Sequence, residues 1–339
     1  MLSPILRTIG AVVKLDVTFL EIPFNLPYSF ARAHHVVSAP LIRVALSDGS
    51  VSGRGEATLF ESPHADPRAA TAGQLESVRS VIEAGVTRED LLKLLPAGPA
   101  RNAVDAALWD LEAKQSGTRV WRLLGLPEPV PLEDMVTISL ADAPQFEQEL
   151  RDSTDCRVLK LKLGSDNDIE RLEVTRRLRP DAQLVVDVNC AWTVGRLEEM
   201  LPVLARHDVR MVEQPVHADD EAGLRGLTHA VPIIADESFY GEEDLPRISE
   251  LYDGVNIKLD KCGGLTAALR IVEQARERGL RLMVGCFAAS SLATAAAFQV
   301  AGLAEFRDIA GHLILTEDTE PSIPCVNGWL SPPAPELWG

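Results

Sequence analysis

Charged residues close a series of short apolar runs in the second half of the sequence, and this pattern constrains the fold more than any other feature. The runs and their charged residues are VLKLKLG with Lys160 and Lys162, LVVDVN with Asp187, MVEQP with Glu213, IIADES with Asp236 and VNIKLD with Lys258. From Lys162 onward, successive members lie 22 to 26 residues apart, which is enough for one strand, one helix and two short loops. The spacing therefore predicts a repeated βα unit.

A closed barrel of parallel strands would bring these side chains to one place. The C-terminal ends of the strands form one rim in such a barrel, and active sites lie there. Lys160 and Lys162 are two residues apart, so on one strand they face the same way. The candidate strand ends are Thr137, Lys162, Asp187, Glu213, Asp236, Lys258, Cys286 and Asp308. They give the eight strands that close this barrel, so we predict an α/β fold built as a modified (β/α) TIM-like barrel.

The chain is longer than one barrel needs, so we expect a second unit. It has 339 residues, whereas a barrel takes about 250. Residues 1–126 are predicted to form an α+β domain, with strands at 13–24 and 41–59, a hairpin turn at 47–50, and helices at 67–84 and 100–116. Residues 127–315 would form the barrel. The proline-rich tail, 316–339, is expected to run back over the first domain.

Composition and charge exclude several kinds of partner. The formal net charge of −17 would repel a polyphosphate backbone, so no nucleic acid is expected as a partner. Gly53-Arg54-Gly55 lacks the remainder of a dinucleotide fingerprint. No apolar run is long enough to cross a membrane, and the N-terminal segment does not resemble a signal peptide. Five scattered cysteines fit a reduced compartment, so we expect a cytoplasmic protein.

The charged residues of the predicted rim suit proton transfer at a carbon next to a carboxylate. Removing that proton adds a second negative charge to the substrate, and a hard divalent cation held by carboxylates stabilises it. We predict that Asp187, Glu213 and Asp236 bind Mg²⁺. Lys162 would be the base, because Lys160 and the metal would lower its pKa. Lys258, on a strand across the barrel, would return the proton on the other face and invert the carbon.

Simpler interpretations exist for the individual residues. Barrel rims are polar, and lysines on strands often only reach for solvent, but six such residues in register argue against that interpretation. Asn189 shares the inward face with Asp187, and Asn256 and Asp260 share it with Lys258. These three are predicted to orient the metal ligands and lysines through hydrogen bonds, with ordinary polar filling of the barrel as the alternative.

Taken together, the motifs resemble the enolase superfamily, specifically its muconate-lactonizing-enzyme-like branch, which contains the dipeptide epimerases. The series from Lys160 to Lys258 carries the resemblance, with Gly55-Glu56-Ala57 and the segment AVDAALWDL at 103–111. The resemblance implies that the first domain caps the barrel, that Lys162 and Lys258 are an acid/base pair, and that Lys160 contacts the substrate carboxylate. It also implies Mg²⁺ on the three acids, a small-molecule substrate and a homo-oligomer.

Within this branch, the expected substrate contacts favour an L,L-dipeptide. The segment 283–286, which ends in Cys286, and Thr137 look like their counterparts in dipeptide epimerases. Asp308 matches the first acid of a DxD pair that holds the dipeptide ammonium, but Ala310 replaces the second acid and Ala289 replaces a frequent glutamate. Loss of one charged contact costs about 1.5–3 kcal/mol of binding free energy. The sequence therefore leaves open which group the substrate carries at its amino end.

Three residues near the N-terminus, Tyr28, Arg32 and His34, are candidates for the distal end of the substrate, and Arg32 suits a carboxylate. Solvated loop positions are the alternative for them. Other enzymes of the same branch share the first proton transfer, so N-acylamino acid racemase, muconate cycloisomerase and o-succinylbenzoate-synthase-like activities stay open. A catalytically inactive barrel kept for binding is a third interpretation, because a fold alone does not establish activity.

Overall fold

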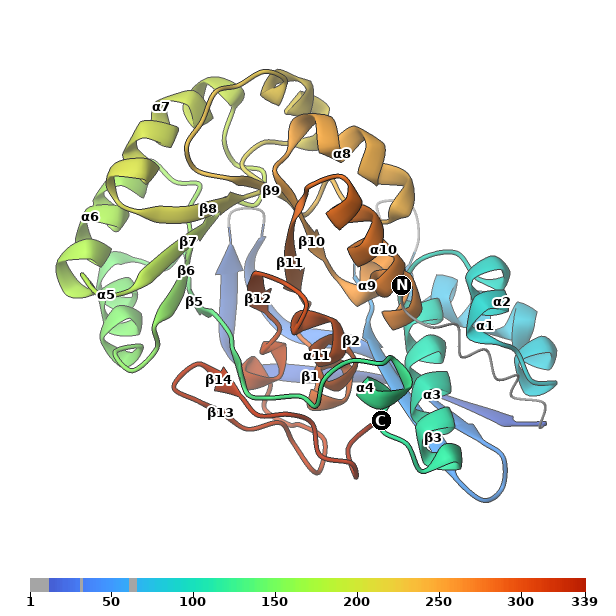
Figure 1. Cartoon of the computed structure of the whole chain (residues 1–339). Helices are drawn as coiled ribbons and strands as arrows, with labels where there is room; N and C mark the ends of the chain where they lie inside the picture. Colours follow the sequence, from blue (N-terminus) through green and yellow to red (C-terminus); the bar gives the residue numbers. More distant parts are fainter. Residues whose placement is uncertain (1–11, 31–32, 61–65) are drawn as a thin grey trace.

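An antiparallel sheet and three helices form the capping domain (Figure 1). The computed structural model describes residues 12–30, 33–60 and 66–339, and the side chains at 26–30 and 33–35 lie outside this description. The elements are β1 (Lys14–Phe30), β2 (Ala33–Ser47), β3 (Ser52–Thr58), α1 (Pro67–Glu83), α2 (Arg88–Leu94) and α3 (Pro99–Ser116). Strand β1 continues past the predicted end at residue 24, because its pairing with β2 resumes after a register shift beyond Pro23. Pro23 is a residue that ordinarily ends a strand, so the sequence pattern did not predict the continuation of β1.

Two glycines let the sheet lie directly on helix α3. A Cβ atom on Gly53 would come within 2.2 Å of the Ala107 carbonyl oxygen, and one on Gly55 within 2.1 Å of the Ala103 carbonyl oxygen. No larger side chain fits at such distances without moving the backbone. The Gly-Arg-Gly segment therefore serves close packing of β3 on α3.

Eight parallel strands follow and curve into a barrel, as predicted (Figure 1). They are β5 (Val136–Ile138), β6 (Val158–Lys162), β7 (Gln183–Asp187), β8 (Val209–Glu213), β9 (Ile233–Ala235), β10 (Gly254–Ile257), β11 (Arg281–Gly285) and β12 (Phe306–Asp308). Each predicted strand end lies within one residue of the observed end. The seam between β12 and β5 is bridged by a hydrogen bond from Met135 N to Arg307 O at 3.1 Å.

Helices join the strands and cover the outside of the barrel. They are α5 (Ala143–Asp152), α6 (Asp168–Leu178), α7 (Val194–Arg206), α8 (Leu245–Leu251), α9 (Leu259–Cys262), α10 (Leu265–Glu277) and α11 (Ser291–Ala301), with 3₁₀ helices η1 (Ala218–Leu224), η2 (Glu242–Asp244) and η3 (Gly311–Ile314). The expectation of an α-helix in every connection is wrong after β8, where η1 stands instead. This segment, ADDEAGL, has too few apolar residues to present a helical face.

The interior of the barrel is apolar at the end away from the predicted rim. The side chains that fill it are Met135, Val185, Met211, Ile234, Met283 and Phe306. The strands are buried on both sides, which is typical of parallel sheets. The charged residues of the sequence pattern lie above this layer, at the C-terminal ends of the strands.

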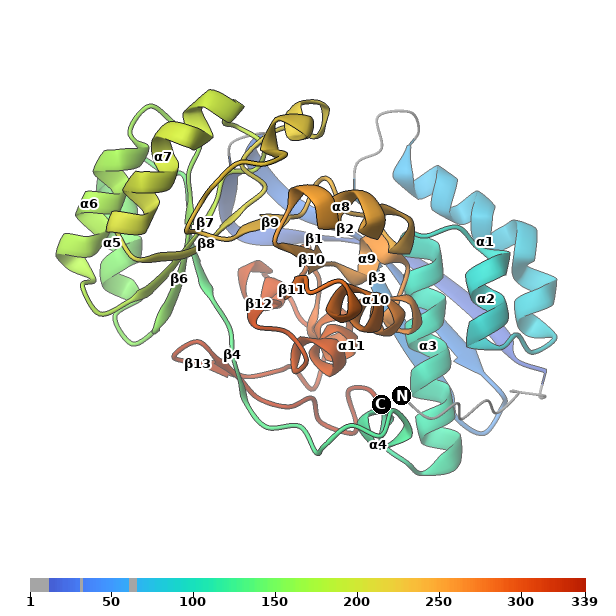
Figure 2. The ribbon, with the colours of Figure 1, turned by 45° about the horizontal axis from the view of Figure 1, so that its top comes forward.

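The tail returns to the capping domain. Between the two units lie α4 (Val120–Leu123) and β4 (Leu132–Glu133), and β4 forms a small sheet with β14 (Trp329–Leu330) and β13 (Cys325–Val326). Trp338 is fully buried, and its indole donates to Ala106 O of α3 at 3.1 Å. Figure 2 shows the end of the chain beside α3 and α4. In the described part of the chain, no helix has the length and apolarity needed to cross a membrane.

Candidate active site

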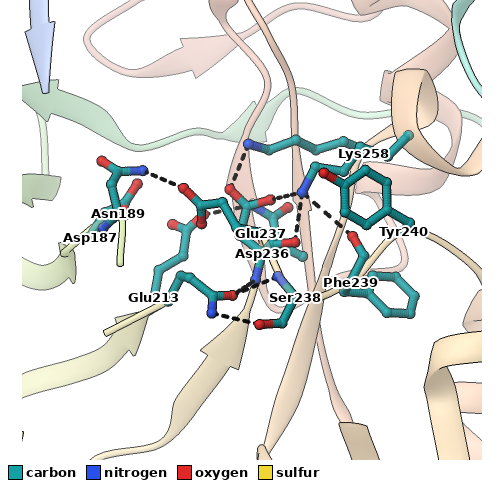
Figure 3. A network of polar contacts seen from close by, with 12 residues as sticks. Asp187, Asn189, Glu213, Asp236, Glu237, Ser238, Phe239, Tyr240 and Lys258 are labelled. Carbon is teal, nitrogen blue, oxygen red and sulfur yellow. Dashed lines mark hydrogen bonds and ion pairs between the residues drawn. The ribbon is translucent and has the colours of Figure 1, made fainter. Parts of the chain in front are cut away.

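Three buried carboxylates lie at the ends of adjacent strands (Figure 3). Asp187 ends β7 and pairs in register with Glu213, which ends β8, and Asp236 directly follows β9. All three are at most 2% exposed. Carboxylates so placed repel one another strongly unless positive charge lies between them.

The predicted lysines supply that charge in this structure. Lys160 Nζ lies 2.7 Å from Glu213 Oε2, 2.7 Å from Asp308 Oδ2 and 3.1 Å from Asp187 Oδ2. Lys162 Nζ lies 2.7 Å from Asp187 Oδ2. On the other side, Lys258 Nζ lies 2.7 Å from Asp236 Oδ2. The barrel therefore brings all six residues of the sequence pattern into one charged cluster.

Lys162 and Lys258 reach this cluster from opposite walls. Lys162 ends β6 and Lys258 directly follows β10, and β7, β8 and β9 lie between those strands in the sheet. In an eight-stranded barrel, strands four positions apart face each other across the axis. A small molecule bound over the carboxylates would have one ammonium group on each side.

Electrostatics differ among the three acids. Burial, together with the charge of Asp187, raises the pKa of Glu213 to about 8. Burial would also raise the pKa of Asp187, but Lys160 and Lys162 outweigh it and hold this pKa at about 2. The pKa of Asp236 is likewise lowered, since Lys258 and Lys261 outweigh its burial. Glu213 is thus the acid whose charge is least compensated.

The pKa of Lys258, the lysine that sequence analysis expects to return the proton, is raised. Burial would lower it, but Asp236 and Glu213 outweigh burial and raise the pKa. The physical reason is the direct ion pair with Asp236. For Lys258 to act as a base, the substrate has to replace Asp236 as the partner of its amino group.

The three acids fit a hard cation by their chemistry and position. They offer carboxylate oxygens from neighbouring strands, and burial leaves their mutual repulsion poorly screened. They are not gathered as a ready ligand set: over 12–30, 33–60 and 66–339, no three His, Cys, Asp or Glu side chains are arranged to hold a metal ion. Their oxygens face Lys160, Lys162 and Lys258 instead.

The two asparagines contact the cluster in different ways. Asn256 Nδ2 donates to Glu213 Oε1 at 2.7 Å, which is the kind of contact expected for a residue that orients an acid. Asn189 accepts from Lys162 Nζ at 2.9 Å through Oδ1 and donates to Glu237 Oε1 at 3.2 Å, while its backbone N–H donates to Asp187 at 3.0 Å. The Asn256 side chain therefore contacts Glu213, whereas the Asn189 side chain contacts Lys162 and Glu237.

Asp260 is not on the inward face, and that part of the sequence analysis is wrong. The strand ends at Ile257, and Asp260 lies in the short helix α9, so the strand alternation does not reach it. Its Oδ1 accepts from Thr58 N at 2.9 Å and from Asn102 Nδ2 at 3.0 Å, both in the capping domain. Asp260 fixes the capping domain to the barrel.

The predicted substrate contacts are spread around the rim. Thr137 pairs in register with Lys160, so it shares the inward face. Asp308 is ion-paired with Lys160. Cys286 follows β11, and burial, followed by the charge of Asp308, raises the pKa of its thiol. Arg32 lies outside the described residues, as do the side chains of Tyr28 and His34.

Sequence analysis missed two residues that hold the cluster. Lys261 Nζ donates to the carboxylate and to the backbone carbonyl of Asp236, both at 2.6 Å. Gln214 Oε1 accepts from Asp236 N at 2.8 Å and from Ser238 N at 3.0 Å. Lys261 stands in a turn sequence, Lys-Cys-Gly-Gly, where a charged residue is ordinary. The position of Gln214 between Glu213 and Pro215, at the end of a strand, is the sequence feature that could have indicated its role.

Comparison with known protein families shows the family to which this chain belongs. Residues 143–334 match the family described as "Enolase C-terminal domain-like", and residues 12–125 match "Mandelate racemase / muconate lactonizing enzyme, N-terminal domain". The chain belongs to the enolase superfamily. The fold class and the family that the sequence predicts are therefore confirmed.

Relatives of this superfamily member include named epimerases and racemases. The L-Ala-D/L-Glu epimerase of Escherichia coli (strain K12) is 37% identical over 310 residues, which cover 91% of this chain and 96% of the relative. The N-acetyl-D-glutamate racemase of Pseudoalteromonas sp is 36% identical over 250 residues, which cover 74% of this chain and 79% of the relative. Both names describe isomerisation of amino acid derivatives.

Solved structures of the enolase superfamily agree closely with this fold. A family member from Agrobacterium tumefaciens with homology to dipeptide epimerases, with bound sodium and L-Ala-L-Glu, matches with a TM-score of 0.91 at 36% identity, covering 96% of this chain and all of the other. The dipeptide epimerase of Methylococcus capsulatus, complexed with Mg and L-Arg-D-Lys, matches with a TM-score of 0.86 at 27% identity, covering 95% and 97%.

Proposed function

We propose that this chain is a Mg²⁺-dependent epimerase of L,L-dipeptides, which removes the proton from the α-carbon beside the terminal carboxylate and returns it on the opposite face. The observation that carries the proposal is the pair of lysines on opposite barrel walls, Lys162 after β6 and Lys258 after β10, around one acidic cluster. The similarity to L-Ala-D/L-Glu epimerase over 91% of the chain supports the substrate class.

In the proposed reaction, one lysine takes the proton and the opposite lysine supplies one. The amine that accepts a proton must be neutral when the substrate arrives, and the other must be an ammonium. Transfer from opposite faces inverts the carbon, because the enediolate between the two steps is planar. Lys160 lies beside the acids and between the two walls, where it would bind the substrate carboxylate.

Asp187, Glu213 and Asp236 would hold the Mg²⁺. A bound divalent cation supplies Lewis-acid stabilisation of the negative charge that grows on the substrate carboxylate. The high pKa of Glu213 supports a cation at this place, since burial and the neighbouring Asp187 leave its charge poorly compensated. The Mg complex of the Methylococcus capsulatus relative supports the same choice of metal.

Asp308 is the proposed partner of the substrate ammonium. Its carboxylate is a quarter exposed, in contrast to the fully covered acids of the cluster. It already pairs with Lys160, so a substrate ammonium would share this carboxylate with a second cation. Dipeptide binding would be weaker than with an unshared acid, and Ala310 offers no second carboxylate.

An N-acylated amino acid is the second candidate substrate. It has no free ammonium, so it needs neither Asp308 nor an acid at position 310. The relative named N-acetyl-D-glutamate racemase, 36% identical to this chain, supports it specifically. Muconate cycloisomerisation and o-succinylbenzoate formation share the lysines, but neither of the two named relatives supports them.

Deuterium uptake separates the two substrates. Purified protein with Mg²⁺ in D₂O is incubated with L-Ala-L-Glu or with N-acetyl-L-glutamate, and proton NMR follows loss of the glutamate α-proton signal. For the dipeptide it also follows growth of the alanine methyl signal of the second diastereomer. We expect exchange and epimerisation of the dipeptide. Exchange of the N-acetyl compound alone would contradict the dipeptide proposal and support the second candidate.

The Asp308→Asn variant tests the ammonium contact. We expect it to weaken dipeptide binding about tenfold to a hundredfold, the value of one charged contact. The N-acetyl compound is the matched control, because it shares the glutamate carboxylates and lacks the ammonium. Equal losses for both compounds would show that Asp308 acts through Lys160 and not on the substrate.

A further inference from the structure

One face of strand β3 docks on the barrel through every second residue. Glu56 Oε1 accepts from Ser290 N at 2.7 Å, and Thr58 Oγ1 donates to Ala288 O at 2.9 Å. Two residues further on, the Phe60 ring stacks on the Phe287 ring with centroids 5.2 Å apart and planes 17° apart. The alternation of β3 thus carries Glu56 and Thr58 along the loop after β11. Phe60, two residues beyond the end of the strand, adds a third contact to this loop.

The last of these contacts reaches one of the two lysines. Lys258 Nζ lies 4.8 Å from the centroid of the Phe287 ring, within the range of a cation–π contact. The Lys258 side chain is 12% exposed, so water screens this contact weakly. Phe60 therefore supports a ring that in turn supports Lys258.

Lys162 has a different setting across the barrel. Its ammonium contacts Asp187 and Asn189, which come from the next strand and from the residues directly after it. The loop that carries Phe287 follows β11, next to β10 and away from β6. Changes at Phe287 or Phe60 act locally on the Lys258 wall.

We propose that the Phe60–Phe287 stack is a positioning device for Lys258, through which docking of the capping domain acts on the proton transfer that Lys258 performs. The proposal rests on the proposed two-lysine epimerisation. Phe287 holds the Lys258 ammonium through its ring face, and Phe60 fixes the plane of that ring. Both are positioning residues, since the chemistry itself stays with Lys258.

Epimerisation rates alone do not test this, because the equilibrium constant ties the forward and reverse rates together. Single-lysine backgrounds remove that tie. In the K162A variant, α-proton exchange in D₂O reports Lys258 alone, and in K258A it reports Lys162 alone. The substitution Phe287→Leu is made in each background, and exchange is measured by NMR on L-Ala-L-Glu and on L-Ala-D-Glu with Mg²⁺.

We expect Phe287→Leu to slow exchange about tenfold in the K162A background, the scale of a poorly screened cation–π contact, and to leave it within about twofold in K258A. Phe60→Leu should give a smaller loss, about threefold, in K162A alone. Phe287→Tyr keeps the ring face and should restore exchange. Thermal unfolding of each variant checks the fold, and a folding defect would lower exchange in both backgrounds equally.

Equal losses in both backgrounds, or no loss in either, would overturn the positioning role of Phe287. A one-sided loss with Phe287→Leu and none with Phe60→Leu would remove the capping domain from the proposal. The proposed function fails separately: in that case K162A and K258A do not divide the two diastereomers between them, whatever residue stands at position 287.

Discussion

The two walls of the barrel mouth present the same functional group in unlike surroundings. The Lys162 ammonium contacts the Asp187 carboxylate and the Asn189 amide, which lie at the end of the neighbouring strand and directly after it. Lys258 is held by Asp236 and an aromatic ring, and that ring is stacked on Phe60 of the capping domain. The contacts of Lys258 thus reach into a second domain. In the proposed reaction, docking of the capping domain therefore belongs to the geometry of the proton transfer at Lys258.

Removal of either ammonium group gives the largest effect expected from this comparison. Lys162→Ala and Lys258→Ala should each reduce kcat for epimerisation by at least about 10²- to 10⁴-fold, the contribution of a positioned acid or base. Coupled assays of dipeptide turnover measure this. Lys14→Ala is the matched control, because Lys14 is an exposed lysine that pairs with Asp16 on the surface. An undiminished rate in either site variant would remove that lysine from the reaction.

The docking that serves the Lys258 wall should depend on pH. Burial raises the pKa of Asp260 to about 6, from an ordinary value of 3.8. The folded state therefore binds the proton of the Asp260 carboxyl more tightly than the unfolded state does. The stabilisation that this proton gives the folded state is complete below pH 3.8 and is lost as pH rises through 6. The loss amounts to about 3 kcal/mol at most.

Asp260→Asn isolates this contribution, because both hydrogen bonds to Asp260 use Oδ1, which an amide retains. The free energy of unfolding in urea, measured from pH 4 to pH 7 for both proteins, should fall with pH less steeply in the variant. Parallel curves would show that Asp260 does not carry the dependence. Activity of the folded variant should change less than its stability, since the hydrogen bonds of Asp260 go to Thr58 and Asn102 of the capping domain.

The two asparagines should separate metal binding from proton transfer, with the smallest expected effects. Asn256→Ala removes the donor to Glu213 and should weaken Mg²⁺ binding about tenfold to a hundredfold, as for other residues that orient metal ligands. Asn189→Ala removes one of the acceptors of Lys162 and should lower kcat with little change in Mg²⁺ affinity. Calorimetric titration with Mg²⁺ measures the first effect, and equal affinities in the two variants would contradict this division.

Sequence alone predicts the strand ends and the cluster because both follow from local rules. A charged residue at the end of each apolar run, repeated at βα spacing, places Asp187, Glu213 and Lys258 on one rim without knowledge of any contact. Asp260 was misplaced because the strand alternation stopped at Ile257 and a short helix began. Such a stop depends on packing with the capping domain and leaves no periodic signal.

Contacts between distant segments were out of reach in the same way. Phe60 and Phe287 are 227 positions apart, and neither stands in a motif. Lys261 and Gln214 bind backbone groups of the loop after β9, so their partners follow from chain geometry and not from residue type. The homo-oligomer, the cytoplasmic location and the domain limits at 126 and 315 stay predictions.

The apolar layer that fills the barrel has a consequence for molecular traffic. Met211, Ile234, Met283 and their neighbours close the interior beneath the charged cluster, so a dipeptide cannot leave through the far end. Arrival and departure share the mouth beneath the capping domain. The two epimers therefore compete for one passage, and accumulated product should inhibit competitively. Substrate entry and product release would then use the same opening of the barrel.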